Sequence, residues 1–400
     1  MPLEVRADCP VGASPGLAAL QRKAPMARAV MPDGQPVWLV TGYHEAKVVL
    51  ADRRFSAVPS NPGYPLAGGF GLHGSILAQT MQRKDPPEHT RMRKLVGRQF
   101  TPARIASFQP IVDAAVEKVL DDLAESGDAV IEFGERAAKR IPAMVTDEIL
   151  GIPAGERTFF QNAAAALFNV HDSAEEFLAS ENRVAEYLRS LLSSGGASPD
   201  GIIAQLVRAR ESRGQLTDEE LVAFILHLVV AGHETTTNQM LLSLWSLLTA
   251  DPPEGRRLSD LDDTQWAEVV EELLRFHAIV RGGPRRAAIE DVEVGGVTIR
   301  AGEGVYVSIW TANHDASVYP TPASWKWARE ASEPEHLAFG HGLHQCLGQY
   351  LARAELRATF RRFFHRFPDA ALDGADEAAL FGSETTNYGM HKLLVRLAPA

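Results

Sequence analysis

The feature that most constrains the fold is a series of helical patterns that fills the middle of the chain. Apolar residues recur three and four positions apart, which is the period of an amphipathic helix. These patterns span residues 88–99, 104–126, 131–150, 156–168, 174–193, 201–213 and 218–249. The last one opens with a capping box at 217–220. Further helices are predicted over 43–51, 263–277 and 349–364. The sequence therefore predicts a mainly α fold.

Strand patterns are short and lie towards the two ends of the chain. The run 291–300 alternates apolar and polar residues around Gly295 and Gly296, which is typical of a β-hairpin. Strands are also predicted over 37–40 and 305–310, and a last hairpin over 385–397. We expect these strands to form small β-sheets beside the helices.

The chain shows no obvious division into several domains. Residues 1–36 are rich in Pro, Gly and Ala without sustained periodicity, and they predict an irregular N-terminal arm. No linker interrupts residues 37–400, which we expect to form a single domain. Residues 56–75 predict a long loop, and such loops inside compact domains are usually lids or binding loops. We expect this loop to cover a substrate.

Charge and cysteine content exclude several classes of function. The net charge of −11 argues against a nucleic acid partner, because phosphate binding depends on clustered Lys and Arg. Only two cysteines are present, Cys9 and Cys346, which favours a reducing compartment over a disulfide framework. The longest apolar run, residues 221–231, is interrupted by His227 and is too short to span a bilayer. We expect a cytoplasmic protein, not bound to a membrane, with a small-molecule or protein partner.

The strongest local signal is the segment 339–348, Phe-Gly-His-Gly-Leu-His-Gln-Cys-Leu-Gly. It places Cys346 just before a predicted helix, among glycines that let the backbone approach a flat ligand. We expect the helix N-terminus to lower the pKa of the Cys346 thiol through its dipole and free N–H groups. Taken alone, the pattern fits either a thiolate ligand or a small buried apolar residue, which is the usual fate of a lone cysteine.

This segment resembles the haem-binding signature of the cytochrome P-450 superfamily, Phe-Gly-x-Gly-x-His-x-Cys-x-Gly, and matches it at every fixed position. The chain as a whole is similar to the soluble bacterial, ferredoxin-dependent type. The resemblance implies a cytochrome P-450-like haem-thiolate fold with Cys346 as the axial iron ligand. It also implies that His344 lies at a haem propionate and that Phe339 packs beside the thiolate. Gly340 and Gly348 belong to the same cofactor-binding loop.

A second segment resembles the Glu-x-x-Arg motif of this family. Glu272 and Arg275 are three positions apart on a predicted helix and can form an ion pair. Such pairs are common on solvated helix faces, so the pattern alone is weak. The resemblance implies a buried pair that stabilises the core beneath the haem. Relatives usually carry an acidic residue where this chain has Lys326, three positions before Arg329, which puts one local ion pair in doubt.

A third segment, residues 231–236, reads Ala-Gly-His-Glu-Thr-Thr in the middle of a long predicted helix. Threonine hydroxyls can bond carbonyls one turn back, so we expect a local bend or a widened groove. The segment resembles the oxygen-binding groove of the family. By this resemblance Glu234 and Thr235 are the catalytic acid and alcohol that order water and supply protons to dioxygen. Ala231 and Gly232 would contact the haem.

Cationic side chains for the haem propionates come from two further segments. His89 and Arg93 are four positions apart and project from one helical face, where they suit a pair of carboxylates. By its spacing to residues 290–291, Arg286 aligns with a third propionate ligand of the family, and Arg285 is the alternative. Without a haem these side chains would be ordinary surface charges.

The resemblance, which covers residues 37–397, implies an oxidoreductase, namely a cytochrome P-450 monooxygenase that holds haem b (iron protoporphyrin IX). It would use dioxygen and two electrons to hydroxylate, epoxidise, desaturate or couple a small organic substrate in secondary metabolite biosynthesis. The electrons would come from NAD(P)H through ferredoxin reductase and ferredoxin, because this chain has no flavin or iron–sulfur motif of its own. By family geometry the substrate pocket would be drawn from residues 56–80, 160–190, 224–235, 279–283 and 384–390.

Other functions remain open at this point. A peroxide-driven haem-thiolate oxidase would not need the Glu234 and Thr235 pair, and a non-catalytic haem-based sensor would need no proton delivery. A zinc module is disfavoured by the lack of paired cysteines. A basic face for ferredoxin and a scatter of solvated charges are alternative interpretations of Arg93, Lys94, Arg98, Arg353, Arg357, Arg361 and Arg362.

Overall fold

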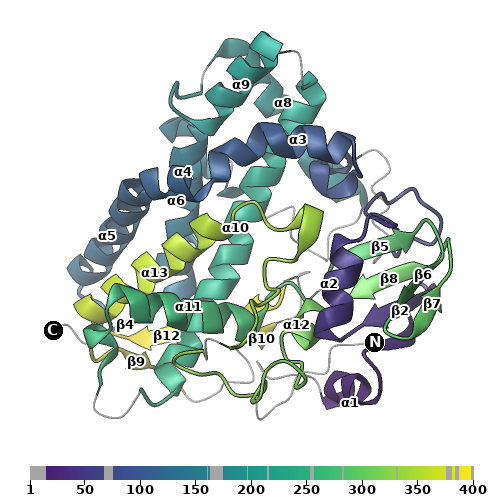
Figure 1. Ribbon diagram of the computed structural model, residues 1–400. Helices are drawn as coiled ribbons and strands as arrows, with labels where there is room; N and C mark the ends of the chain where they lie inside the picture. The colour runs from purple at the N-terminus through teal and green to yellow at the C-terminus, as the bar shows by residue number, and fades with distance from the viewer. Residues whose placement is uncertain are drawn as a thin grey trace.

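A computed structural model describes residues 15–397 except 67–74, 160, 163–173, 196, 214–215, 253–255, 282, 330–331, 375–380 and 383–386. Helices fill one side of a triangular molecule, and the largest sheet forms the opposite corner (Figure 1). The helices are α1 (Pro15–Lys23), α2 (Tyr43–Ala51), α3 (Glu88–Val96), α4 (Pro102–Ser107), α5 (Gln109–Glu125), α6 (Arg140–Leu150), α8 (Ala174–Ser194), α9 (Ile202–Arg213), α10 (Asp218–Thr249), α11 (Asp263–His277), α12 (Ile309–Ala312) and α13 (Gln349–Arg366).

Short helical turns and strands connect and flank these helices. The turns are η1 (Ile76–Gln79), η2 (Met81–Arg83), η3 (Gly97–Phe100), η4 (Gly134–Ala138), η5 (Ala154–Glu156), η6 (Leu258–Asp260) and η7 (Gly342–His344). The strands are β1 (Met26–Val30), β2 (Pro36–Val40), β3 (Phe55–Ser56), β4 (Val130–Glu132), β5 (Arg285–Ala288), β6 (Val292–Val294), β7 (Val297–Ile299), β8 (Gly304–Val307), β9 (Ala371–Leu372), β10 (Phe381–Gly382), β11 (Gly389–Met390) and β12 (Leu394–Arg396).

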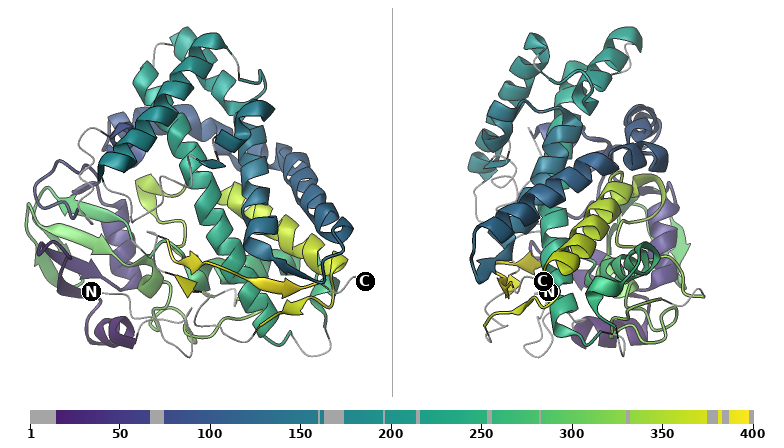
Figure 2. Two further views of the ribbon diagram at one scale, coloured as in Figure 1. Left: turned by 180° about the vertical axis from the view of Figure 1, so that it is seen from behind. Right: turned by 90° about the vertical axis from the view of Figure 1, so that its left-hand side faces the viewer.

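Helix α10 runs through the centre of the helical side and packs against η1, α6, α8 and α13 (Figures 1 and 2). It begins with the predicted capping box, because the Glu220 amide donates to the Thr217 hydroxyl at 3.1 Å and the Thr217 amide donates to the Glu220 carboxylate at 3.0 Å. Most of its side chains are buried, whichever way they point around the helix. That pattern is typical of a helix inside a core. The middle of α10 is therefore a fixed wall on which a site can be built.

The largest sheet has five strands in the order β1-β2-β8-β5-β3. Strands β2 and β8 are parallel, with Trp38 opposite Val305, and the other neighbouring strands are antiparallel. The sheet shares a hydrophobic core with α2 and α12, in which Val40, Val49 and Ile309 are buried. This packing fixes β5, the strand that carries Arg285 and Arg286.

Three small sheets complete the fold. The predicted hairpin at 291–300 is present as β6 and β7, which are antiparallel around Gly295 and Gly296. The predicted hairpin over 385–397 is wrong, because β11 pairs with β10 and β12 pairs with β4 and β9. Leu394 lies opposite Glu132, so this pairing joins distant parts of the chain and leaves no local signal.

Other differences from the prediction have local causes. The arm over 1–36 is not irregular where it is described, because it contains α1 and β1, and β1 turns at Gly34 to pair with β2. The helix predicted over 104–126 divides at Phe108, since Pro110 cannot donate in a continuing helix and its ring clashes with the preceding turn. The helix predicted over 131–150 begins only after β4 and η4, as α6. The strand predicted over 305–310 ends before Ser308, which caps α12.

Parts of the predicted loop 56–75 and of the predicted helix 156–168 lie outside the described residues. The same holds for parts of the predicted pocket segments 160–190 and 384–390. In the described part of the chain, no helix combines the length and the apolar character needed to cross a bilayer.

Candidate active site

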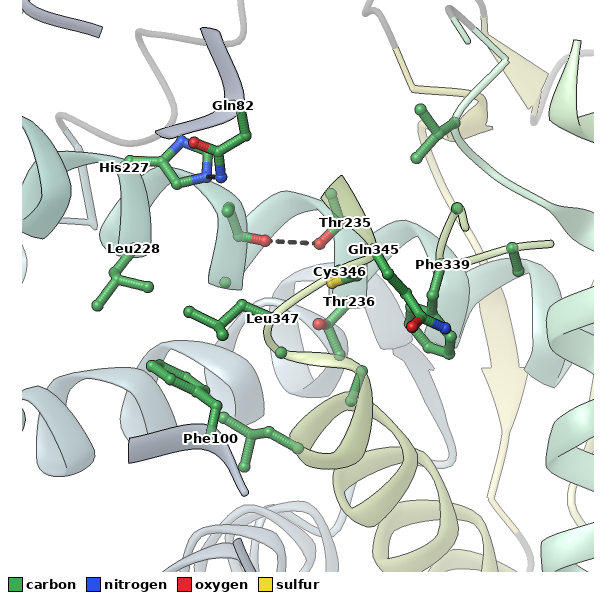
Figure 3. A pocket seen from close by; sticks show the side chains of 18 of the residues that line it. Gln82, Phe100, His227, Leu228, Thr235, Thr236, Phe339, Gln345, Cys346 and Leu347 are labelled. Carbon is green, nitrogen blue, oxygen red and sulfur yellow. Dashed lines mark hydrogen bonds between the residues drawn. The ribbon is translucent and has the colours of Figure 1, made fainter. Parts of the chain in front are cut away.

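A cavity of about 460 Å³ lies between the middle of α10, the loop before α13 and the turn η2 (Figure 3). Most of the side chains that line it are apolar, among them Phe100, Ile149 and Leu228. The predicted site residues on its wall are His89, Arg93, Ala231, Gly232, Thr235, Phe339, Gly340, His344, Cys346 and Gly348. The fold therefore brings together segments that are more than two hundred positions apart in the sequence.

Cys346 projects into this cavity from the loop 339–348 (Figure 3). Its amide donates to the Phe339 carbonyl at 2.8 Å, which closes the loop on itself. Gly342 has a positive φ of 71°, and a Cβ there would lie 2.5 Å from the Leu50 carbonyl of α2, so only glycine fits. The loop is thereby pressed against α2 and presents the thiol to the cavity.

The Cys346 thiol is exposed by surface area, yet protein atoms enclose it, because its exposed surface faces the cavity interior. Burial raises the pKa of this thiol, against the opposing effects of the Gly348 and Gln349 amides and of the Arg93 and Arg353 charges. The prediction that the helix N-terminus lowers the pKa of Cys346 is therefore wrong, because the net shift is upward. The amides act in the expected sense, but removal from water outweighs them.

His89, His344 and Arg93 line one side of the cavity, and the charge of Arg286 acts on both histidines from behind them. The rings of His89 and His344 have centroids 4.4 Å apart. Both ring nitrogens of His89 and Nδ1 of His344 are buried with no hydrogen-bond partner among the described residues. Burial, together with the charges of Arg286 and Arg93 and the neighbouring His89, lowers the pKa of His344 to about 3. Buried ring nitrogens without a hydrogen-bond partner, next to arginine charges, suit an anionic group of a ligand.

The two candidate arginines of β5 have different surroundings. Arg286 is buried, and its charge lowers the pKa values of His89 and His344 after the larger effect of their burial. The charge of Arg285 instead acts on Tyr306 and Arg83. Successive residues of a strand point to opposite faces, which accounts for the difference. The surroundings favour Arg286 as the partner of the histidine cluster, although Arg286 itself does not line the cavity.

On α10, Ala231, Gly232 and Thr235 line the cavity. The Thr235 hydroxyl donates to the Ala231 carbonyl at 2.7 Å, the bond to the preceding turn that the sequence predicts. At Gly232 a Cβ would lie 2.8 Å from Thr146 Oγ1, so glycine permits close packing against α6. Glu234, which the resemblance pairs with Thr235, is partly buried beside this wall and does not line the cavity.

Several polar residues on the cavity wall were not named as site residues from the sequence, although His227 lies in the predicted pocket segment 224–235. Gln82 of η2 and His227 of α10 are hydrogen-bonded to each other above the cavity (Figure 3). Glu355 of α13 also lines it, and burial raises the pKa of this carboxyl to about 8. His227 precedes Ala231 and Thr235 by one and two helical turns, so the four-residue spacing was a usable signal. For Gln82 and Glu355 the sequence carries no such signal.

One buried and one partly buried ion pair support the loop that carries Cys346. Arg275 contacts Glu272 at 2.7 Å, and the two side chains are only 2% and 1% exposed, in agreement with the predicted pair. Arg275 also donates to the Asn313 carbonyl at 2.8 Å. The neighbouring Glu271 accepts from Arg353 at 2.5 Å. Burial alone would raise the pKa of Glu271, but hydrogen bonds from His336 and Arg353 lower it to about 2.

The ion pair placed in doubt by Lys326 is replaced by another arrangement. Arg329 contacts Glu333 at 3.3 Å and Glu272 at 3.8 Å, and Lys326 contacts Glu333 at 3.2 Å. Glu333 thus supplies the negative charge that position 326 lacks.

Several arginines proposed for a basic face already pair with acidic residues of this chain. Arg353 pairs with Glu271, Arg361 with Asp263, and Arg362 with both Asp113 and Glu117. Their positive charge is partly neutralised, which favours the interpretation of solvated, paired side chains over an uninterrupted basic surface.

Comparison with known proteins identifies the family. The family model described as Cytochrome P-450 matches residues 264–377. Cytochrome P-450-SU2 of Streptomyces griseolus is 37% identical over 391 residues, covering 96% of this chain and 94% of that protein. Nocardicin C N-oxygenase of Nocardia uniformis subsp. tsuyamanensis is 36% identical over 364 residues, covering 90% and 89%.

A solved structure agrees with these sequence matches. The crystal structure of cytochrome P-450 MoxA from Nonomuraea recticatena superimposes with a TM-score of 0.89 at 33% identity, covering 100% of this chain and 99% of that one. The chain belongs to the cytochrome P-450 family. It is an oxidoreductase of the haem-thiolate monooxygenase family, and the predicted fold class, mainly α with small sheets, is confirmed.

Proposed function

We propose that this chain is a cytoplasmic monooxygenase that uses dioxygen and two electrons from a ferredoxin to oxidise a small organic substrate, in the biosynthesis of a secondary metabolite. The observation that carries the proposal is the position of Cys346, whose thiol faces a largely apolar cavity beside a cluster of buried imidazole and guanidinium groups. Family membership supplies the reaction class.

The residues around the cavity fit haem b. Cys346 would ligate the iron, and His89, Arg93, His344 and Arg286 would bind the propionates, which satisfies the buried ring nitrogens that have no partner among the described residues. The flat faces would pack on Ala231, Gly232, Phe339, Gly340 and Gly348. When bound, this cofactor supplies the one-electron and dioxygen chemistry that side chains lack.

The protein's own contribution on the α10 side is to hold protons and exclude water. The Thr235 hydroxyl donates its one proton to the Ala231 carbonyl, and this bond fixes the direction of the oxygen lone pairs that it offers at the cavity wall. We propose that Thr235 acts with Glu234 as the alcohol and acid of proton delivery. Because Glu234 lies beside the cavity wall, this role requires a water or a side-chain movement between the two groups. The apolar lining keeps bulk water from the reacting substrate.

Electron supply would come from NAD(P)H through a ferredoxin reductase and a ferredoxin. Lys94, Arg98 and Arg357 remain the candidate cations for ferredoxin, since Arg93 lines the haem cavity and Arg353, Arg361 and Arg362 pair within the chain. The interaction should weaken with ionic strength if these charges steer the partner.

A turnover experiment tests the proposal against its alternatives. The haem-loaded protein is incubated with NADPH, ferredoxin reductase, ferredoxin and isotopically labelled dioxygen, using a compound that shifts the haem absorption. We expect labelled oxygen in the product and no product without ferredoxin. Product with peroxide but none with reduced ferredoxin would establish the peroxide-driven alternative. Haem and ligand binding without product under either condition would establish the sensor.

A further inference from the structure

Gln82 and His227 form a polar pair in a cavity whose other walls are mostly apolar (Figure 3). Gln82 comes from η2, and His227 lies on the face of α10 that also carries Ala231 and Thr235. The Gln82 amide nitrogen donates to His227 Nε2, and neither side chain makes another hydrogen bond among the described residues. Polar groups placed singly in an apolar pocket usually set ligand orientation and specificity.

The pair leaves one donor and one acceptor for a ligand. With the amide as described, Gln82 Oε1 is a buried acceptor without a partner, and His227 carries its proton on Nδ1. If the amide is turned over, Gln82 offers an N–H donor and His227 Nδ1 becomes the acceptor. In both orientations the complementary ligand group must itself both donate and accept.

Neither member of the pair is itself charged near pH 7. Burial lowers the pKa of His227 to about 4, with a smaller contribution from the charge of Arg83, so the imidazole is neutral near pH 7. Gln82 is neutral at any pH. An ionised carboxylate would lose its hydration here without gaining a cation from the pair, so a neutral group is favoured.

The segment that carries Gln82 is clamped at both ends by carboxylates. At its start, Glu181 of α8 is buried and accepts from Ser75 Oγ at 2.7 Å and from the amides of Ile76 and Leu77. At its end, Asp85 accepts from the Ala57 amide at 2.9 Å and from the Ser56 hydroxyl. Gln82 is therefore presented to the cavity before a ligand arrives, which reduces the ordering cost of binding.

We propose that Gln82 and His227 are the polar anchor of the substrate site, and that the substrate is a mainly apolar molecule with one neutral group that both donates and accepts, such as a carboxamide, lactam or hydroxyl. This rests on the proposed function. His227 and Thr235 are eight positions apart on one helix, which corresponds to about 12 Å at 1.5 Å per residue. Oxidation is therefore expected at the end of the substrate remote from its polar group.

Three probes of one chain length test the proposal, and they differ only in the terminal group. Lauramide both donates and accepts, undecyl methyl ketone only accepts, and laurate is charged. Dissociation constants for the haem-loaded protein are measured by calorimetry and by the change in haem absorption. We expect lauramide to bind about tenfold more tightly than the ketone, as one or two net hydrogen bonds would give, and more tightly than laurate.

Variants separate the anchor from general packing. In Gln82→Leu and in His227→Phe we expect the preference for lauramide over the ketone to disappear, while ketone affinity stays within about threefold of the parent. Gln79→Leu is the matched control, because Gln79 is exposed on the neighbouring turn and pairs with Lys84 at 3.1 Å. This control should keep the full preference.

Three results would overturn the anchor: equal affinity of the parent for amide and ketone, a preference that survives in both variants, or tighter binding of laurate than of lauramide. Failure of the proposed function would be distinct, because it would appear as a protein without haem or as absent turnover with ferredoxin. Calorimetric binding does not depend on electron supply, so each failure can be recognised.

Discussion

The wall of the cavity that carries Cys346 is held by ion pairs, of which Glu272–Arg275 is fully buried. The opposite wall, formed by α10 and η2, is held by apolar packing and by hydrogen bonds, including those that Glu181 and Asp85 accept on either side of η2. Behind the first wall, the Glu272–Arg275 and Glu271–Arg353 pairs fix α11, α13 and the loop between them. On the second, Thr235 bonds its own helix and Gln82 bonds His227. We therefore expect substitutions that break the ion pairs of the first wall to lower stability more than substitutions of single cavity side chains on the second.

Removal of the buried pair should break the first wall and have the largest effect. In Arg275→Leu the buried Glu272 carboxylate keeps only its longer contact with Arg329, at 3.8 Å, and the bond from the Lys326 amide, so we expect the free energy of unfolding to fall by about 3 kcal/mol. Denaturant unfolding followed by haem absorption measures this loss. The matched control is Arg300→Leu, which removes an exposed pair with Asp291 at 2.6 Å and should lower stability far less. Equal losses in both variants would contradict the account.

Glu355 of α13 is a buried carboxyl in the wall that carries Cys346, and its titration gives a pH test of how that wall is held. The pKa of Glu355 is about 8 in the folded protein, above its ordinary value of 4.5, because of burial. Protonation is therefore favoured by folding, and stability falls as pH rises from 4.5 to about 8. Between about pH 5 and pH 7, Glu355→Gln should gain stability over the parent by up to about 3 kcal/mol, from 1.36 kcal/mol per pH unit.

Thermal unfolding midpoints over a pH series measure this gain. The control is Glu125→Gln, the same substitution at an exposed position. If the difference in unfolding midpoint between Glu355→Gln and the parent does not change with pH, the carboxyl is ionised in the folded protein.

A change on the second wall should affect chemistry more than stability. In Thr235→Ala the hydroxyl group at the cavity wall is lost, and we expect the product formed per NADPH consumed to fall about a hundredfold with haem retained. The control, Thr237→Ala, removes a hydroxyl that donates to the Ala138 carbonyl at 3.0 Å, outside the cavity lining. Its product yield should stay close to that of the parent. Unchanged yield in Thr235→Ala would remove Thr235 from proton delivery.

The smallest effect is expected at the position where the chain departs from its relatives. Lys326→Ala removes one contact of Glu333 but leaves its contact with Arg329 at 3.3 Å. We expect the free energy of unfolding to change by less than about 1 kcal/mol, measured by denaturant unfolding. A loss as large as that of Arg275→Leu would mean that Lys326 belongs to the buried network of the first wall.

The two walls also differ in how far the sequence predicts them. The bounds of α10 and α11 agree with their predicted ranges, because helical period and caps are local signals, and the loop at Cys346 is one contiguous motif. The contact between Gln82 and His227 joins residues 145 positions apart, and no periodicity reports it. The pairing of β4 with β12 could not be predicted for the same reason. The direction of the Cys346 pKa shift could not be predicted either, because burial of the thiol depends on the whole fold.

The central claim is that Cys346 is the thiolate ligand of a haem, and the visible spectrum tests it most directly. The purified protein is reduced with dithionite and exposed to carbon monoxide, beside the Cys346→Ala variant. We predict a strongly red-shifted Soret band in the parent and its absence in the variant. An unshifted band in the parent, or a red-shifted band that survives in Cys346→Ala, would contradict the claim.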